Sequence, residues 1–230
     1  MIKTYLTSEE IQQMIGVAST LRDKVILSFY GDTGCRASEL LRLKVEDVDF
    51  ETGIVRIPHL KRGIKKKCPV CDKTAGRRTA FCSKCGYDLS DVKAEGIEER
   101  SRLISIGNET RELLRVYLQD SAPEDKIINI SRQRVHGIVR QAGINIGLKG
   151  KAIINPETGK KHYVHPHLFR DSLAVAWLGL VGNDAGKQKA LQDHLGHRNF
   201  DTTMRYHKLT PEAVQDVSNE VRQARFKEVE

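Results

Sequence analysis

Apolar side chains recur at intervals of three and four residues along most of this chain, the pattern of helices with one buried face. The first such segment follows Thr7-Ser8-Glu9-Glu10, where a Thr-x-x-Glu pattern predicts a capping box at a helix start. Further helices are predicted at these positions: 24–30, 36–43, Asn108 through Leu118, from Ser131 onward, 166–180, 184–195, and a polar helix from Thr210.

Two segments differ from the helical pattern, because Gly53–Ile57 and Arg102–Ile106 are rich in β-branched residues and typical of strands. These two strands would form a hairpin if a long segment did not separate them. Residues 143–162 are rich in Gly, Lys and Asn and are predicted to form a loop. The sequence therefore predicts a mainly α (α+β) fold with a small antiparallel sheet, interrupted by an insert at 62–100.

The composition is that of an ordinary globular protein, with 39% hydrophobic and 30% charged residues among 230. The longest nearly unbroken apolar run, Leu173–Gly182, is half the length of a membrane span, and the N-terminus lacks the apolar core of a signal peptide. We therefore expect no membrane association and a cytoplasmic location.

The net charge of +8 is concentrated in one place, since residues 60–102 hold twelve Lys or Arg against six Asp or Glu. That segment carries +6, and the rest of the chain contributes only +2. This surplus favours contacts to phosphate, and the alternative is a solvated charged face. The candidate phosphate-binding residues are Lys65, Lys66, Lys67, Arg77 and Arg78.

Four of the five cysteines form a C-x2-C-x10-C-x2-C pattern within the same segment: Cys68, Cys71, Cys82 and Cys85. Two such pairs supply the four sulfurs of a tetrahedral zinc site, and disulfides are not expected in a chain without an export signal. Four protein ligands leave no open position, so the expected metal is one structural Zn²⁺ per chain. The fifth cysteine, Cys35, is expected to be a small buried side chain.

Three further segments carry candidate chemistry: Thr33-Gly-Cys-Arg36-Ala-Ser-Glu39-Leu, His167-x-x-Arg170, and Leu195-Gly-His197 followed by Thr-Thr and Tyr206. Each residue alone has a structural explanation, such as a helix-capping arginine or a tyrosine in the core. Together, in this order and spacing, they resemble the three conserved boxes of the tyrosine recombinase (phage integrase) catalytic domain. The resemblance runs from about Leu6 to Leu209, without the insert.

The resemblance implies a DNA strand-transfer enzyme, a recombinase or integrase, with Tyr206 as the nucleophile that forms a 3′-phosphotyrosyl bond. Arg36 and Arg170 would clamp the scissile phosphate, and His167 would assist proton transfer. By the same resemblance, His197 would hydrogen-bond the phosphate, and the chemistry would need no catalytic metal or nucleotide.

Two supporting roles follow from the same family. Lys61, on the loop after the first box, best matches the lysine that would protonate the 5′ leaving oxygen, although Arg62 and Lys65 compete for this role. Glu39 would support the first-box helix without taking part in the chemistry.

The sequence departs from the family pattern in three places. The insert begins directly after Lys61, Asp171 stands where many relatives have His, and only 35 residues precede Arg36. The family's N-terminal core-binding domain is thus expected to be absent, and residues 1–230 are predicted to be the catalytic domain.

The expected partners are double-stranded DNA and further copies of this chain. The C-terminal helix carries an apolar stripe that would join a tetramer on DNA, although packing on its own domain is equally compatible. The alternative functions are a topoisomerase-like nicking-closing enzyme of type IB and a zinc-ribbon DNA-binding module on a catalytically silent scaffold. Residues 1–230 with their complete set of catalytic side chains favour the recombinase, which would be nucleoid-associated.

Overall fold

The computed structural model describes residues 3–58, 65–76, 78–93, 101–155, 158–182, 184–197, 199–200 and 203. Its helices are α1 (Ser8–Gly16), α2 (Leu21–Thr33), α3 (Ala37–Leu40), the 3₁₀ turn η1 (Val45–Asp47), α4 (Asn108–Tyr117), α5 (Arg132–Asn145), α6 (Pro166–Val181) and α7 (Ala185–Leu195). Its strands are β1 (Val48–Asp49), β2 (Ile54–Pro58), β3 (Lys65–Lys67), β4 (Thr74–Gly76), β5 (Ser101–Ser105), β6 (Ile153–Ile154) and β7 (Lys161–His162).

The chain divides into two compact units, one made of Met1–Ile57 with Arg102–Glu230 and the other of Pro58–Ser101. The second unit includes the whole segment 62–100 that the sequence predicts as an insert. Each unit has its own buried cluster of side chains, so each is described by itself below.

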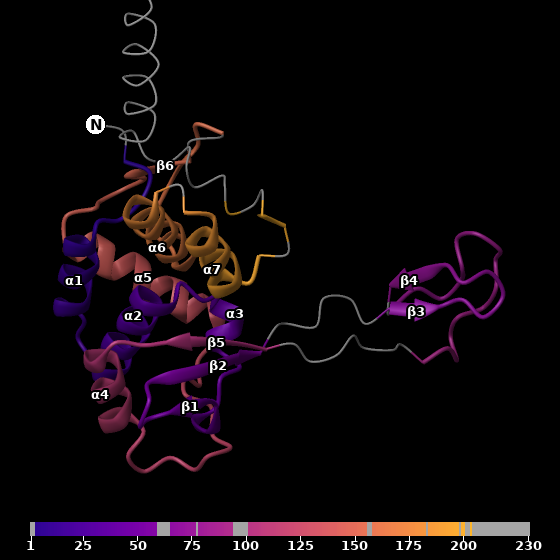
Figure 1. Ribbon diagram of the computed structural model, residues 1–230, viewed down its shortest axis with the longest axis horizontal. Helices are drawn as coiled ribbons and strands as arrows, with labels where there is room; N and C mark the ends of the chain where they lie inside the picture. Colours follow the sequence, from indigo (N-terminus) through magenta and orange to yellow (C-terminus); the bar gives the residue numbers. More distant parts are fainter. Residues whose placement is uncertain are drawn as a thin grey trace, which may run out of the picture. The chain divides into compact units, whose positions relative to one another are not determined.

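Helix α2 is the central helix of the first unit, where it packs against α1, α4 and α6 (Figure 1). Eight of its 13 residues are buried, including Tyr30, whose ring centroid lies 5.8 Å from that of Phe169 on α6. A helix covered on all sides carries apolar residues on every face, which is why the pattern here predicts a helix. The predicted helix starts too late, at Lys24, because the first turn of α2 is polar. The helix begins at Leu21, and the Thr20 hydroxyl caps it by accepting the Asp23 N–H at 3.1 Å.

The three-stranded sheet of the first unit has the order β1-β2-β5 (Figure 1). The two predicted strands are therefore neighbours, as expected, and their inward positions include the buried Ile57 and Ile104. Strand β1, which pairs antiparallel with β2 through Val48 and Val55, has only two residues and gives no periodic signal in the sequence.

The polar cap residues set several helix starts. The predicted capping box of Thr7 and Glu10 is confirmed, and the Ser131 Oγ accepts the Arg134 N–H at 3.2 Å at the start of α5. The prediction that Asn108 caps α4 is wrong by one residue: Gly107 is the cap, with its N–H donated to Asp32 at 2.7 Å. The predicted loop at 143–162 contains the short hairpin β6–β7.

Helices α6 and α7 pack against each other through a separate apolar cluster that includes Leu178 and Leu191. Pro166 occupies the first turn of α6, where its missing N–H leaves no hydrogen bond unmade. The predicted mainly α fold with small antiparallel sheets is confirmed. The predicted polar C-terminal helix lies outside the described residues.

None of the helices in the described part of the chain combines the length and the apolar composition needed to cross a membrane.

Candidate active site and metal cluster

Arg36 stands at the start of α3, directly after the turn that ends α2. Gly34 ends α2 in the left-handed conformation with φ +54°, and a Cβ there would lie 3.2 Å from the Cα of Arg170. A side chain at position 34 would therefore push apart α2 and α6. Glycine at this position lets the first-box arginine approach the second-box helix.

The Glu39 carboxylate, on the same helix α3, holds Arg36 in place. Its Oε2 accepts the Arg36 backbone N–H and its Oε1 accepts the guanidinium NH1, each at 2.9 Å. Glu39 is 1% exposed, whereas the Arg36 side chain is 31% exposed. Arg36 therefore presents part of its guanidinium to solvent while Glu39 holds its base.

A second arginine completes this buried group. Arg102 of β5 donates NH1 and NH2 to Glu39 at 3.2 and 2.8 Å. Burial raises the pKa of Glu39, but the hydrogen bonds and charges of Arg102 and Arg36 outweigh it and lower the pKa to about 2. Glu39 is thus ionised at neutral pH.

Arg102 is absent from the residues that the motifs select, although the strand pattern holds a signal for it. Residues 101–105 alternate between exposed and buried, and Arg102 falls on the buried face with Ile104. A charged residue at an inward position of a strand requires a buried partner, because an unpaired charge there is too costly. Glu39 is that partner.

Helix α6 carries the second box on its first two turns. Arg170 is fully buried and donates NH1 to the Gly34 carbonyl at 3.1 Å and NH2 to the Leu195 carbonyl. His167 has a side chain that is 56% exposed, and its Nε2 lies 3.6 Å from Oδ1 of Asp171 one turn later. The structure thus places a buried guanidinium and an exposed imidazole on one end of α6.

The third box begins at the C-terminal end of α7. Gly196 ends this helix with φ +65°, and the Nδ1 of His197 lies 2.9 Å from the Thr203 Oγ1. The Gln192 amide donates to the His197 carbonyl at 3.0 Å. Thr203, which no motif assigned a role of its own, is fully buried and fixes the His197 ring.

Arg170 connects the three boxes, because it binds the Gly34 carbonyl of the first box and the Leu195 carbonyl of the third, and its charge acts on both histidines. Burial and then the charges of Arg170 and Arg36 lower the pKa of His197 to about 3. Partial desolvation lowers the pKa of His167 as well, and Arg170 and Arg36 add to the effect while Asp171 opposes it. Four of the six predicted catalytic residues therefore form one cationic cluster with two neutral imidazoles.

Two predicted catalytic residues, Lys61 and Tyr206, lie outside the described residues, as does Arg77 of the insert. Cys35 is 1% exposed, which agrees with the small buried side chain that the sequence predicts.

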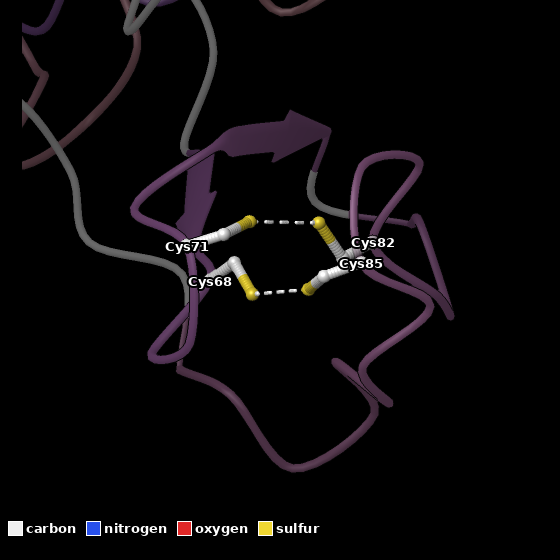
Figure 2. Close-up of side chains that lie close together, drawn as sticks. All are labelled: Cys68, Cys71, Cys82 and Cys85. Carbon is white, nitrogen blue, oxygen red and sulfur yellow. Dashed lines mark hydrogen bonds between the residues drawn. The ribbon is translucent and has the colours of Figure 1, made fainter.

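The second unit brings the four cysteine sulfurs together (Figure 2). All four Sγ atoms lie within 4.8 Å of one another, with 3.5 Å between Cys68 and Cys85 and between Cys71 and Cys82. A tetrahedron of sulfurs around a zinc ion at about 2.3 Å has edges of roughly 3.8 Å. The cluster therefore has the donor set and the dimensions of a metal site.

The two cysteine pairs share one backbone conformation. The Cys68 carbonyl accepts the Asp72 N–H at 2.9 Å, and the Cys82 carbonyl accepts the Gly86 N–H at 2.8 Å. Asp72 and Gly86 both have positive φ, at 57° and 74°, so a sharp turn follows each pair. The Lys84 N–H also lies 3.4 Å from the Cys82 Sγ, a contact that favours the thiolate.

The basic residues of the insert differ in exposure. Lys65, Lys67 and Arg78 are exposed, and Lys67 pairs with Asp72 at 3.0 Å. Lys66 is buried and donates its ammonium to the Leu89 carbonyl. The structure thus places Lys66 in the packing of the insert, away from the phosphate-binding surface predicted for it.

The whole arrangement matches a known sequence family, since the model of the Phage integrase family covers residues 4–213. The chain belongs to the phage integrase family. The matched range begins before α1 and ends past the third box.

Relatives in this family differ in how much of their length the chain covers. The tyrosine recombinase XerA of Saccharolobus solfataricus is 24% identical over 211 residues, which are 92% of this chain and 53% of XerA. The type 1 fimbriae regulatory protein FimE of Escherichia coli K12 is 27% identical over 208 residues, 89% of this chain and 85% of FimE. The chain thus spans about half of one relative and most of the other.

A solved structure supports the family fold. The crystal structure of XerA recombinase superposes with a TM-score of 0.62 at 22% identity, over 96% of this chain and 64% of that one. At this identity the likeness concerns the fold.

Proposed function

We propose that this phage integrase family member is a site-specific DNA recombinase or integrase that cuts and rejoins strands through Tyr206. The observation that carries the proposal is the cluster of Arg36, Arg170, His167 and His197, which three separate segments bring to one place in a recombinase fold. The relative XerA, which is named a tyrosine recombinase, supports the reaction class.

In the proposed reaction the Tyr206 oxygen attacks the scissile phosphorus and forms a phosphotyrosyl bond. The bond from phosphorus to the 5′ oxygen breaks, and that oxygen takes a proton from Lys61. His167 accepts the tyrosine proton, which suits an imidazole whose lowered pKa keeps it neutral near pH 7. Religation runs the same steps in reverse, and the phosphotyrosyl bond conserves the energy of the broken ester.

The arginines balance the charge that grows on the phosphate in the transition state. Arg36 is partly exposed and can reach a phosphate directly. Arg170 is buried against the Gly34 and Leu195 carbonyls, so we propose that it acts through its charge and through the backbone that it holds. Direct contact by Arg170 with a non-bridging oxygen requires DNA to open this part of the site.

His197 is proposed to hydrogen-bond the phosphate through Nε2. Its Nδ1 faces the Thr203 hydroxyl at 2.9 Å, which fixes the ring. A pKa of about 3 keeps the imidazole neutral, so it contributes a hydrogen bond and no charge.

The insert is proposed to fold around one structural Zn²⁺ held by the four cysteines: Cys68, Cys71, Cys82 and Cys85. Its own buried cluster contains, besides cysteines, little more than Leu89, Ala75 and Val92. So small an apolar core does not stabilise a fold, and a bound metal supplies the missing free energy. The exposed Lys65, Lys67 and Arg78 are the proposed DNA contacts of the insert, together with Arg77, which lies outside the described residues.

Double-stranded DNA is the proposed substrate, which would place the protein in the cytoplasm with the nucleoid. We further propose that residues 210–230 join copies of the chain into a tetramer on DNA, and that residues 1–230 form a catalytic domain with an insert at 62–100. The competing enzyme activity, type IB topoisomerase-like nicking and closing, shares the cleavage step. Strand exchange between two sites, against relaxation of one plasmid, separates the two.

The test is capture of the covalent intermediate from a pool of nicked duplexes with randomised sequence. The full chain should form an adduct that survives denaturation, and sequencing the trapped DNA gives the preferred site. Tyr206→Phe should form none, whereas Tyr163→Phe, a change at a tyrosine that stacks under Arg140 at 3.7 Å, should react normally. An adduct that persists in Tyr206→Phe would reject the assigned nucleophile. No adduct from the unmodified chain at low salt would favour the catalytically silent DNA-binding alternative.

A further inference from the structure

Arg102 occupies an unusual position in the chain, at the boundary of the two units. It is the first residue of the first unit after the insert, on strand β5. Its side chain is 6% exposed and that of its partner Glu39 is 1% exposed. A buried arginine needs several hydrogen bonds to offset its desolvation, so its partners show what it holds in place.

One side of the Arg102 guanidinium fixes Arg36 through Glu39. NH1 and NH2 bind the two carboxylate oxygens at 3.2 and 2.8 Å, a two-pronged arrangement. The same two oxygens accept the Arg36 guanidinium and the Arg36 backbone N–H, both at 2.9 Å. Each carboxylate oxygen of Glu39 therefore accepts one hydrogen bond from Arg36 and one from Arg102. The carboxylate can orient Arg36 only as firmly as Arg102 orients the carboxylate.

The other side of the guanidinium fixes the end of α7. Nε donates to the His194 carbonyl at 2.8 Å, one of the last carbonyls of this helix, which have no partner within the helix. His197 follows three residues later. The next carbonyl, of Leu195, accepts from Arg170, so two buried arginines bind adjacent carbonyls just before His197.

We propose that Arg102 is a positioning residue of the phosphate site, which sets Arg36 through Glu39 and the turn that carries His197 through the His194 carbonyl. This inference rests on the proposed function, because it assigns Arg36 and His197 to the scissile phosphate. Three bonds from one planar group link the first and third boxes, and neither box contains Arg102.

Only arginine has the geometry for this role. Lysine keeps the charge but offers one tetrahedral nitrogen, which cannot bind both carboxylate oxygens and a carbonyl in one plane. Arg102→Lys therefore preserves charge and approximate volume while it loosens the geometry. The alternative, an ion pair that contributes only to folding, predicts normal cleavage by every molecule that folds.

The first experiment measures single-turnover adduct formation at saturating DNA with the duplex selected by the pool experiment above. Arg102→Lys should slow the cleavage rate by about 10- to 100-fold, the scale expected when reacting groups shift by an ångström or less. Duplex affinity, measured in a Tyr206→Phe background, should change less than threefold. The matched control is Arg56→Lys on the neighbouring strand β2, since Arg56 pairs with Asp47 at 2.9 Å and is 57% exposed. Normal cleavage per folded Arg102→Lys molecule would overturn the proposal.

A double variant separates positioning from folding. Arg102→Met with Glu39→Gln removes both buried charges together, which avoids an unpaired carboxylate and favours a folded protein. The double variant should cleave no more slowly than the slower of the single variants Arg102→Met and Glu39→Gln, because both changes break the same linkage between Arg102 and Arg36. A folded double variant with the unmodified rate would show that the pair serves stability alone and would overturn the proposal.

A readout independent of activity keeps this test apart from that of the proposed function. Inorganic phosphate is titrated into the full chain, and the imidazole NMR signals of His167 and His197 report binding. Arg102→Lys should weaken phosphate binding at least threefold, and Arg56→Lys should not. If the unmodified chain forms no adduct, the recombinase assignment fails, and this titration still decides the role of Arg102. Equal phosphate affinity in Arg102→Lys and the unmodified chain would reject it.

Discussion

Asp171 lies one helical turn after His167 on α6, with its Oδ1 3.6 Å from the His167 Nε2. The carboxylate raises the pKa of His167 against the lowering effects of desolvation, Arg170 and Arg36. In the sequence, Asp171 stands out only as a departure from the family pattern. The structure shows that the departure places a negative charge beside the proposed base.

Replacing Asp171 should therefore change the pH dependence of cleavage. In Asp171→Asn the opposing charge is gone, so the pKa of His167 should fall further. If neutral His167 accepts the tyrosine proton, the acid limb of the rate profile should move to lower pH. NMR titration of the ring protons and adduct formation against pH check the two effects.

The control for this change is Asp193→Asn on α7. Asp193 is exposed and pairs with Lys189 at 2.7 Å, so it carries the same charge without contacting the cluster. An acid limb that moves equally in both variants would show a general charge effect and contradict the assignment.

Buried histidines should make the protein less stable in mild acid. Burial is the main cause that lowers the pKa of His165 and His194 to about 4 and of His197 to about 3. Below the unfolded value, about 6.5, the unfolded chain binds protons that the folded chain does not. The free energy of unfolding should then be highest above pH 6.5 and fall as the pH is lowered toward 4, by at most about 1.4 kcal/mol per pH unit for each histidine before solvent exposure is discounted.

Urea denaturation at a series of pH values measures this slope. His194→Gln keeps a donor within reach of the Thr33 carbonyl, which lies 3.2 Å from the His194 Nε2, but does not titrate. Its stability should therefore fall less steeply between pH 6.5 and 4.5. Parallel curves for the variant and the unmodified chain would refute the assignment of His194 to this acid response.

Gly34 should tolerate no side chain. In Gly34→Ala the positive φ costs about 1–2 kcal/mol, and the new Cβ would lie 3.0 Å from the Leu173 Cδ2 and 3.2 Å from the Arg170 Cα. We expect a lower free energy of unfolding and slower cleavage, because α2 and α6 must separate at the site.

Gly137→Ala is the matched glycine change. Gly137 lies exposed within α5, and a methyl group added there would meet no neighbouring side chain within 4 Å, so alanine should stabilise the helix by about 0.5–1 kcal/mol. Chemical denaturation of both variants checks the pair of predictions. A neutral Gly34→Ala would mean that the turn adjusts freely, which its contacts with Arg170 do not suggest.

Residue patterns predicted most of the first unit for a definite reason. Helices α6 and α7 have a proline or a cap at the start and an apolar stripe, so their bounds agree with the structure within about a residue. Helix α5 starts as predicted but runs to Asn145, three residues into the predicted loop 143–162. The helix predicted at 36–43 is only the four-residue α3, and the two-residue strands β6 and β7 are too short for a period to show. Tertiary contacts, such as that of Ile154 N–H with the Lys3 carbonyl at 2.8 Å, determine these pieces.

The candidate site divides in a similar way. Arg36, His167, Arg170 and His197 are recognisable because their spacing along the chain is local to each box. The connection between the boxes is not local: Arg102 and Glu39 are 63 residues apart, and no spacing rule relates them. That Arg170 is buried on two carbonyls likewise depends on how α2, α6 and α7 pack.

Metal removal should unfold the insert without unfolding the first unit. We expect about one zinc per chain, and its loss in Cys82→Ser, because three sulfurs hold zinc much less tightly than four. Trypsin should then cleave within 65–93 while the remainder of the chain stays resistant. Metal analysis and proteolysis measure both effects, and Cys35→Ser, a change at a buried cysteine outside the cluster, should keep its zinc. Zinc retained in Cys82→Ser would contradict the four-sulfur site.

Truncation of the neighbouring lysines Lys65 and Lys66 to alanine should affect different properties, DNA binding for Lys65 and stability for Lys66. Lys66 is buried and donates to the Leu89 carbonyl, so Lys66→Ala should destabilise the insert by about 1–3 kcal/mol. Lys65 is exposed on the same strand, so Lys65→Ala should leave stability unchanged. If Lys65 contacts a phosphate, its removal should reduce the salt dependence of duplex affinity by about one unit of slope. Thermal unfolding and binding at several salt concentrations measure the two effects, and an unchanged slope in Lys65→Ala would assign its charge to the solvated surface.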